Sequence, residues 1–90
     1  MPKVFFTESF KRKFKKFIKG KPDFANLIET KLLLLETTPY DPSLRNHKLG
    51  GSLNEYRAIY IDYDCRIIFL PYKPTDSYYL IDIGDHDDVY

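Results

Sequence analysis

The C-terminal part of the chain reads Tyr56-Arg-Ala-Ile-Tyr-Ile-Asp62, then Asp64-Cys-Arg-Ile-Ile-Phe-Leu70, then Tyr78-Tyr-Leu-Ile-Asp-Ile83, and closes with Gly84-Asp-His-Asp-Asp-Val-Tyr90. The first three runs are short, rich in isoleucine and aromatic residues, and bounded by turn-forming residues. That composition predicts three β-strands joined by two hairpins and followed by a polar tail. Much of the candidate core and most of the candidate reactive side chains fall in these runs.

The alternation of side chains predicts which face of each strand is buried. Ile59 and Ile61 share one face of the first strand, and the second strand is apolar on both faces, which predicts a central position in the sheet. In the third strand, Ile81 and Ile83 share one face, so Asp82 is expected on the other, less buried face.

The N-terminal half changes to a helical period. Val4-Phe5-Phe6 is expected to be an edge strand, and Thr7 is well placed to cap a helix that ends at Gly20. Apolar residues in that helix recur on one face: Phe10, Phe14, Phe17 and Ile18. Pro22 then suits the first turn of a second helix, whose apolar stripe runs to Leu35.

Together these patterns predict an α+β fold. We expect one domain over residues 1–90, with an N-terminal strand and two antiparallel helices packed on one face of a mainly antiparallel twisted sheet of about four strands. Residues 40–52 contain one proline and two glycines without a sustained period, and are expected to form an ordered loop that delivers His47 to the sheet.

The composition excludes several classes of protein and of site. A single cysteine, Cys65, permits neither an intramolecular disulfide nor a cysteine-based metal site within one chain. No apolar run approaches the roughly 18 residues that span a bilayer, and Met1 is not followed by a secretion signal. We therefore expect a soluble cytoplasmic protein that does not associate with membranes.

The first helix is strongly basic. Seven of the fourteen basic residues lie between Lys11 and Lys21, a segment without Asp or Glu, although the net charge of the chain is only +1. An unusually basic helix face can simply be solvated, but a field of one sign favours a polyanionic partner. The residues expected to contact phosphates are Lys11, Arg12, Lys15, Lys16 and Lys19, with Arg45 and Lys48 from the loop.

The remaining candidates are histidines and one strand arginine. His47 and His86 can exchange protons near neutral pH, and His86 follows Gly84, which lets the chain turn out of the sheet. Arg66 lies in an otherwise apolar strand, so it is expected to pair with Asp82 or Asp64 or to bind a phosphate. Scattered carboxylates at no recognised spacing make a metal site a weak alternative, and Cys65 is expected to be inert.

The order of these elements and several motifs resemble the RelE/ParE toxin superfamily. The segments that carry the likeness are Arg45-Asn-His-Lys-Leu-Gly-Gly51, Tyr56-Arg57, Asp64-Cys-Arg-Ile-Ile-Phe69 and Asp82-Ile-Gly-Asp-His-Asp-Asp-Val-Tyr90. They are most similar to the YafQ-like and RelE/StbE branch of type II toxin–antitoxin systems. The resemblance covers almost the whole chain.

The resemblance implies a ribosome-dependent endoribonuclease that cuts messenger RNA in the ribosomal A site without a metal or other cofactor. The ribose 2′-hydroxyl attacks the adjacent phosphate, so an acid, a base and a cation are needed. By position, His86 is expected to be the acid, His47 or Asp64 the base and Arg66 the phosphate clamp, while Tyr90 packs a base or orients the phosphate. A cognate antitoxin, 16S rRNA contacts and operator binding through the antitoxin are also implied.

Three positions depart from the pattern. Where some YafQ-like toxins have a histidine, a tryptophan and an arginine, this chain has Tyr60, Cys65 and Asp82. Tyr60 could act through its hydroxyl, whereas Asp82 would repel phosphate unless Arg66 neutralised it. These departures keep two alternatives open: a ParE-like toxin that inhibits DNA gyrase by binding, and an inactive relative serving in autoregulation.

Overall fold

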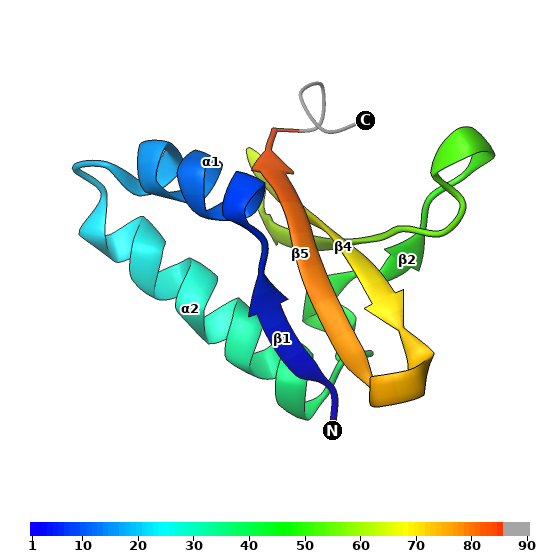
Figure 1. The fold of residues 1–90 in the computed structure, drawn as a ribbon. Helices are drawn as coiled ribbons and strands as arrows, with labels where there is room; N and C mark the ends of the chain where they lie inside the picture. Colours follow the sequence, from blue (N-terminus) through cyan, green and yellow to red (C-terminus); the bar gives the residue numbers. More distant parts are fainter. Residues whose placement is uncertain (86–90) are drawn as a thin grey trace.

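Two helices cover one face of a five-stranded mixed sheet (Figure 1) in the computed structural model, which describes residues 1–85. The strands follow the order β1-β5-β4-β3-β2. Their bounds are β1 Lys3–Phe6, β2 His47–Lys48, β3 Arg57–Asp62, β4 Cys65–Tyr72 and β5 Ser77–Gly84. The helices are α1, Glu8–Ile18, and α2, Pro22–Thr37. The expected α+β class is confirmed, and the strand count rises from about four to five because the loop contributes β2.

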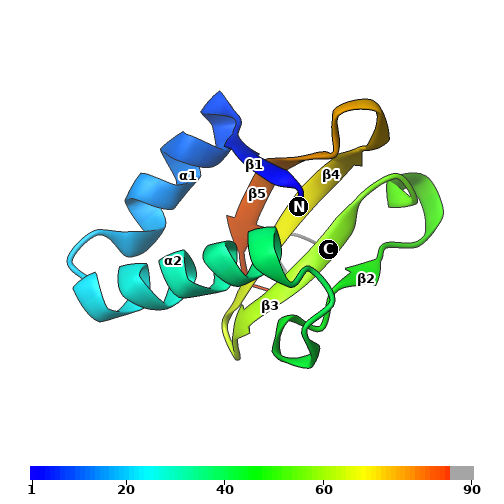
Figure 2. The same cartoon turned by 90° about the horizontal axis from the view of Figure 1, so that it is seen from below.

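The helix ends follow the sequence signals. Thr7 Oγ1 accepts a hydrogen bond from the Phe10 amide at 3.3 Å, which caps α1. The same hydroxyl donates to the Leu80 carbonyl at 2.6 Å, so the cap also fastens α1 to β5. Gly20 has a φ of 71°, a conformation that costs glycine little, and it allows the chain to reverse into α2. The chain therefore reverses after α1, and α2 runs back across the sheet at an angle to α1 (Figure 2).

The main core lies between the helices and the sheet. Phe10, Ile28 and Leu35 of the helices are fully buried against the middle strands. The strand residues in this cluster are Ile59, Ile61, Cys65, Ile67, Phe69, Leu80 and Ile83. β4 is central, as its two-sided apolar pattern predicts, and β1 is an edge strand that runs parallel to β5.

A β-bulge in β5 corrects one prediction. Ile68 pairs with Asp82 while Phe69 pairs with Leu80, so Ile81 is the extra residue. Leu80 and Ile83 consequently both face the helices, and Ile81 is only partly buried instead of sharing a core face with Ile83. Asp82 keeps its predicted position on the opposite face, next to Ile68.

The side of the sheet that faces away from α1 and α2 is called the open face below. It carries a second, small apolar cluster of Leu49, Ala58 and Ile68, with Tyr56 packed against it. The loop of residues 40–52 supplies Leu49 to this cluster and places His47 in β2, which confirms its predicted role. The open face also holds three of the candidate functional residues, Arg45, His47 and Arg66.

Candidate functional site

Two neighbouring rows of side chains cross the open face. In one row Tyr60 of β3 lies opposite Arg66 of β4, and Arg66 lies opposite Gly84 of β5. The next row runs from His47 through Ala58 and Ile68 to Asp82. Residues two positions apart on a strand point to the same face and lie about 7 Å apart. Because Ile68 is two residues from Arg66, the two rows are neighbours and His47 and Arg66 lie on one surface. Gly84 leaves the end of the first row without a side chain.

Tyr60 forms the centre of a cationic cluster. The Arg45 guanidinium carbon lies 4.3 Å from the centroid of the Tyr60 ring, and that of Arg66 lies 4.7 Å from it. Arg66 reaches the ring from β4, and Arg45 reaches it from the segment before β2, where a φ of 48° turns the chain. Tyr60 therefore holds two positive charges close together on the open face.

Arg66 is held by main-chain carbonyls, which corrects the predicted pairing with Asp82 or Asp64. Its Nη1 donates to the carbonyl oxygens of Asp62 at 2.7 Å, Cys65 at 3.2 Å and Tyr63 at 3.4 Å. These contacts fix the guanidinium over the β3–β4 turn without using a carboxylate as partner among residues 1–85. Its positive charge is therefore not cancelled by an ion pair within that part of the chain.

His47 is oriented by its own loop. Its Nδ1 lies 2.8 Å from the Arg45 carbonyl oxygen, which can only accept, so Nδ1 carries the proton. In the neutral ring Nε2 is then the basic nitrogen. The same segment thus supplies one arginine of the cluster and orients the histidine beside it.

Two other sequence candidates, Asp64 and Cys65, lie at the β3–β4 turn, next to the Arg66 guanidinium. Asp64 lines a hollow of about 430 Å³ with Phe17, Lys21 and other residues of the α1–α2 turn. Cys65 is fully buried, and burial, followed by the nearby Asp62, raises the pKa of its thiol to about 12. The expectation that Cys65 is inert fits this environment. His86 and Tyr90 lie outside the described residues.

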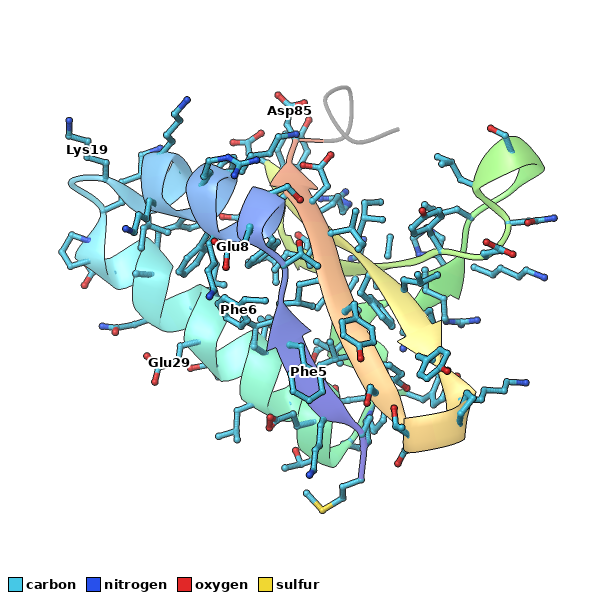
Figure 3. All side chains as sticks on the ribbon, viewed as in Figure 1. Phe5, Phe6, Glu8, Lys19, Glu29 and Asp85 are labelled. Atoms are coloured by element: carbon cyan, nitrogen blue, oxygen red, sulfur yellow. The ribbon has the colours of Figure 1, made fainter. Side chains whose placement is uncertain are left out.

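The basic helix lies beside the end of β5. Lys11, Arg12, Lys15 and Lys16 of α1 are all exposed, as is Lys19 just after the helix. Lys11 pairs with Glu8 at 3.4 Å, and Figure 3 shows Lys19 projecting outward at the end of the helix. Lys48, in contrast, pairs with Arg57 in register and lies on the face opposite His47. The predicted phosphate contacts are thus distributed over more than one surface.

Asp82 has an unforeseen partner, Lys13 of α1. Lys13 Nζ lies 2.7 Å from Asp82 Oδ1, and the same oxygen accepts the Ile83 amide at 2.8 Å. Lys13, and not Arg66, therefore neutralises Asp82. Neither residue signals this contact in the sequence, because 69 positions separate them. Tyr60 is the other residue whose contacts only the structure defines, although the sequence already shows it as a departure from the family pattern.

Among residues 1–85, no group of three or more histidine, cysteine or acidic side chains is arranged to hold a metal ion. The same part of the chain contains no helix with the length and apolar character needed to cross a membrane.

Comparison with known proteins identifies the family of this chain. Residues 2–90 match the family described as the bacterial toxin of type II toxin–antitoxin system, YafQ. The chain belongs to the YafQ toxin family. A search of curated protein sequences gave no match.

Solved structures of similar proteins have the same fold. A copper-bound mutant toxin from Helicobacter pylori is 28% identical, with full coverage of both chains and a TM-score of 0.78. YafQ from Escherichia coli BL21(DE3) is 15% identical over 100% of this chain and 99% of its own, with a TM-score of 0.80. YafQ in the E. coli DinJ–YafQ complex is 20% identical over the same fractions, also with a TM-score of 0.80. The predicted membership of a YafQ-like toxin family is thereby confirmed.

Proposed function

We propose that this YafQ-family toxin is a metal-independent endoribonuclease that cleaves messenger RNA in the ribosomal A site. The observation that carries the proposal is the open face, where His47 lies one row from the Arg45–Tyr60–Arg66 cluster. A base beside two cations meets the main needs of phosphoryl transfer to an internal hydroxyl. The family match to YafQ also favours this proposal over the ParE-like alternative.

The chemistry needs two proton transfers. The base removes the proton of the ribose 2′-hydroxyl, whose oxygen then bonds to the adjacent phosphorus. The bond from phosphorus to the 5′-oxygen breaks, and the acid protonates that leaving oxygen. The products are a 2′,3′-cyclic phosphate and a 5′-hydroxyl. Negative charge builds on the non-bridging oxygens during the step, so a fixed guanidinium lowers the barrier.

The geometry supports His47 over Asp64 as the base. The hydrogen bond from Nδ1 to the Arg45 carbonyl makes Nε2 the proton acceptor of the neutral ring. Asp64, two residues from Arg66, instead lines a hollow beside the α1–α2 turn. Arg66 is assigned as the phosphate clamp because carbonyl contacts hold it without neutralising it. His86 is assigned as the acid and Tyr90 as the aromatic that packs a base.

The partners follow from the same assignment. The exposed cations of α1 would contact phosphates of 16S rRNA and hold the toxin in the A site. E. coli YafQ forms a complex with DinJ, and by analogy a cognate antitoxin would bind this chain, cover its basic surface and attach the complex to operator DNA.

The decisive test is primer extension on a translated message after induction in cells. The wild-type chain should produce new 5′ ends within the reading frame, and His86→Ala should abolish them and relieve growth arrest. Cys65→Ser should not, because the buried thiol has no role in the reaction. Full toxicity of His86→Ala would reject the acid assignment. Intact message with gyrase-linked DNA breaks would instead identify a ParE-like poison.

A further inference from the structure

Three aromatic rings lie together on the open face, at the opposite end from the arginine cluster. Phe5 and Tyr79 stack with their centroids 5.4 Å apart, and Tyr72 meets Tyr79 edge to face at 6.4 Å. Phe5 is 43% exposed, Tyr72 is 49% exposed and Tyr79 is partly buried. We infer that this aromatic strip, Phe5, Tyr72 and Tyr79, binds unstacked bases of single-stranded RNA.

Strand register places the strip on the surface that carries Arg66. Phe5 of β1 lies opposite Tyr79 of β5, and Tyr79 lies opposite Leu70 of β4. Leu70 is four residues from Arg66 and therefore on the same face, about 13 Å along the strand. Phe6, the neighbour of Phe5, points the other way, toward the helices, where it contacts Phe10 (Figure 3). One single strand a few nucleotides long can thus reach both groups of residues.

The charges around the strip suit a polyanion. Lys3 is two residues from Phe5 on the same side of β1, and Lys73 follows Tyr72. Asp76, which precedes Ser77 at the start of β5, lies 3.6 Å from the N-terminal ammonium, which offsets its charge. Proteins that bind single strands without sequence preference combine aromatic platforms with flanking cations in this way. The rings would hold bases while Arg66 and the lysines hold phosphates.

The inference rests on the proposed function, since it assigns the strip to the RNA that the enzyme would cleave. A single strand is the occupant because bases in a duplex are stacked on each other and do not offer their faces. Leucine is the informative replacement for the tyrosines and phenylalanine, because it keeps an apolar side chain on the strand and removes the ring.

The experiment measures binding without cleavage. The probe is a short single-stranded RNA that is 2′-O-methylated throughout, so that no 2′-hydroxyl can attack, and that carries 2-aminopurine, whose fluorescence falls on stacking. The double variant Tyr72→Leu/Tyr79→Leu should bind about tenfold or more weakly and quench less than wild type. The dependence of affinity on salt should not change, because no phosphate contact is lost. Leu33→Ala, an exposed apolar residue of α2, is the matched control and should bind like wild type.

The possible outcomes distinguish base binding by the aromatic strip from the proposed cleavage activity. Equal probe affinity and equal quenching in wild type and the double variant would overturn the inference, while cleavage of translated message by both would leave the proposed function standing. Wild-type protein that neither binds the probe nor cuts message would overturn both. If the double variant lost only its affinity for an antitoxin, the strip would be a protein-docking surface and the inference would be wrong. Thermal unfolding by circular dichroism confirms that each variant is folded.

Discussion

Cys65 shows how burial controls a reactive side chain. Its sulfur is enclosed by the helices and the sheet, and burial raises the pKa of the thiol to about 12 from a usual value of 9.0. The thiolate, which is the reactive form, is therefore about a thousandfold scarcer at pH 8 than in an exposed cysteine. Iodoacetamide should label Cys65 at the rate of global unfolding, as measured by mass spectrometry across a urea series. Rapid labelling of the folded protein would contradict this prediction.

The raised pKa of Cys65 also predicts how stability depends on pH. The folded state holds the thiol proton more tightly than the unfolded chain, so this contribution is complete below pH 9 and is lost as pH rises toward 12. The free energy of unfolding of the wild-type chain should therefore fall with pH above 9 more steeply than that of Cys65→Ala. Urea titrations at several pH values compare the slopes, and parallel slopes would show that the thiol is not the cause.

Tyr60 allows the ring and the hydroxyl to be tested separately. If the ring positions Arg45 and Arg66, Tyr60→Phe should keep cleavage near wild type, whereas Tyr60→Leu should lower kcat/KM about tenfold by releasing two cation–π contacts. If the hydroxyl takes part in proton transfer, Tyr60→Phe should be as inactive as Tyr60→Leu. The pH profile of cleavage by Tyr60→Phe provides the second readout, and a positioning role leaves its shape unchanged.

At the scale of elements, the cap of α1 doubles as a tether to the sheet. Thr7 Oγ1 accepts from the Phe10 amide and donates to the Leu80 carbonyl, so Thr7→Ala removes both bonds. We expect a loss of about 1–2 kcal/mol in the free energy of unfolding, measured in urea. Thr30 is a matched control, because its hydroxyl bonds back to Asn26 within α2 and Thr30→Ala should be nearly neutral. Equal effects of the two substitutions would argue against the tether.

The Lys13–Asp82 pair links the same helix to the last strand. Both side chains are partly exposed, so a double-mutant cycle should give a coupling of only about 0.5–1 kcal/mol that shrinks at high salt. Asp82→Ala should cost more than Lys13→Ala, because Asp82 also accepts the Ile83 amide. A coupling near zero at low salt would show that the contact does not hold α1 against β5.

At the scale of the whole molecule, the cations of α1 lie on the side of the helix that faces away from the core. The apolar face of α1 packs into the main cluster, and its opposite face presents a row of cations. If that row binds rRNA phosphates, Arg12→Gln/Lys16→Gln should weaken ribosome binding and reduce its salt slope by about one unit per lost contact. Lys31→Gln on α2 is the control and should leave the slope unchanged. Co-sedimentation with ribosomes at several salt concentrations measures both.

Much of the fold was predictable because local patterns determine it. The helix boundaries follow from Thr7, Gly20 and Pro22, and the two hairpins follow from alternating strands bounded by turn residues. The short strand β2 escaped prediction because a pairing of two residues leaves no period in the sequence. The bulge at Ile81 also escaped, since it exists only in the register of β5 against β4, where it puts Leu80 and Ile83 on the same face.

The candidate site, like the fold, was only partly predictable from the sequence. The sequence by itself determined the types of residue available, among them His47, Arg66 and the basic α1, because residue chemistry and helical spacing are local properties. Only the tertiary structure decided which of them act together. Strand pairing places His47 beside Arg66, turns Lys48 to the other face and leaves Asp64 near the α1–α2 turn. Lys13 neutralises Asp82, and Phe5 joins Tyr79, because sheet register and helix docking bring together residues that are far apart along the chain.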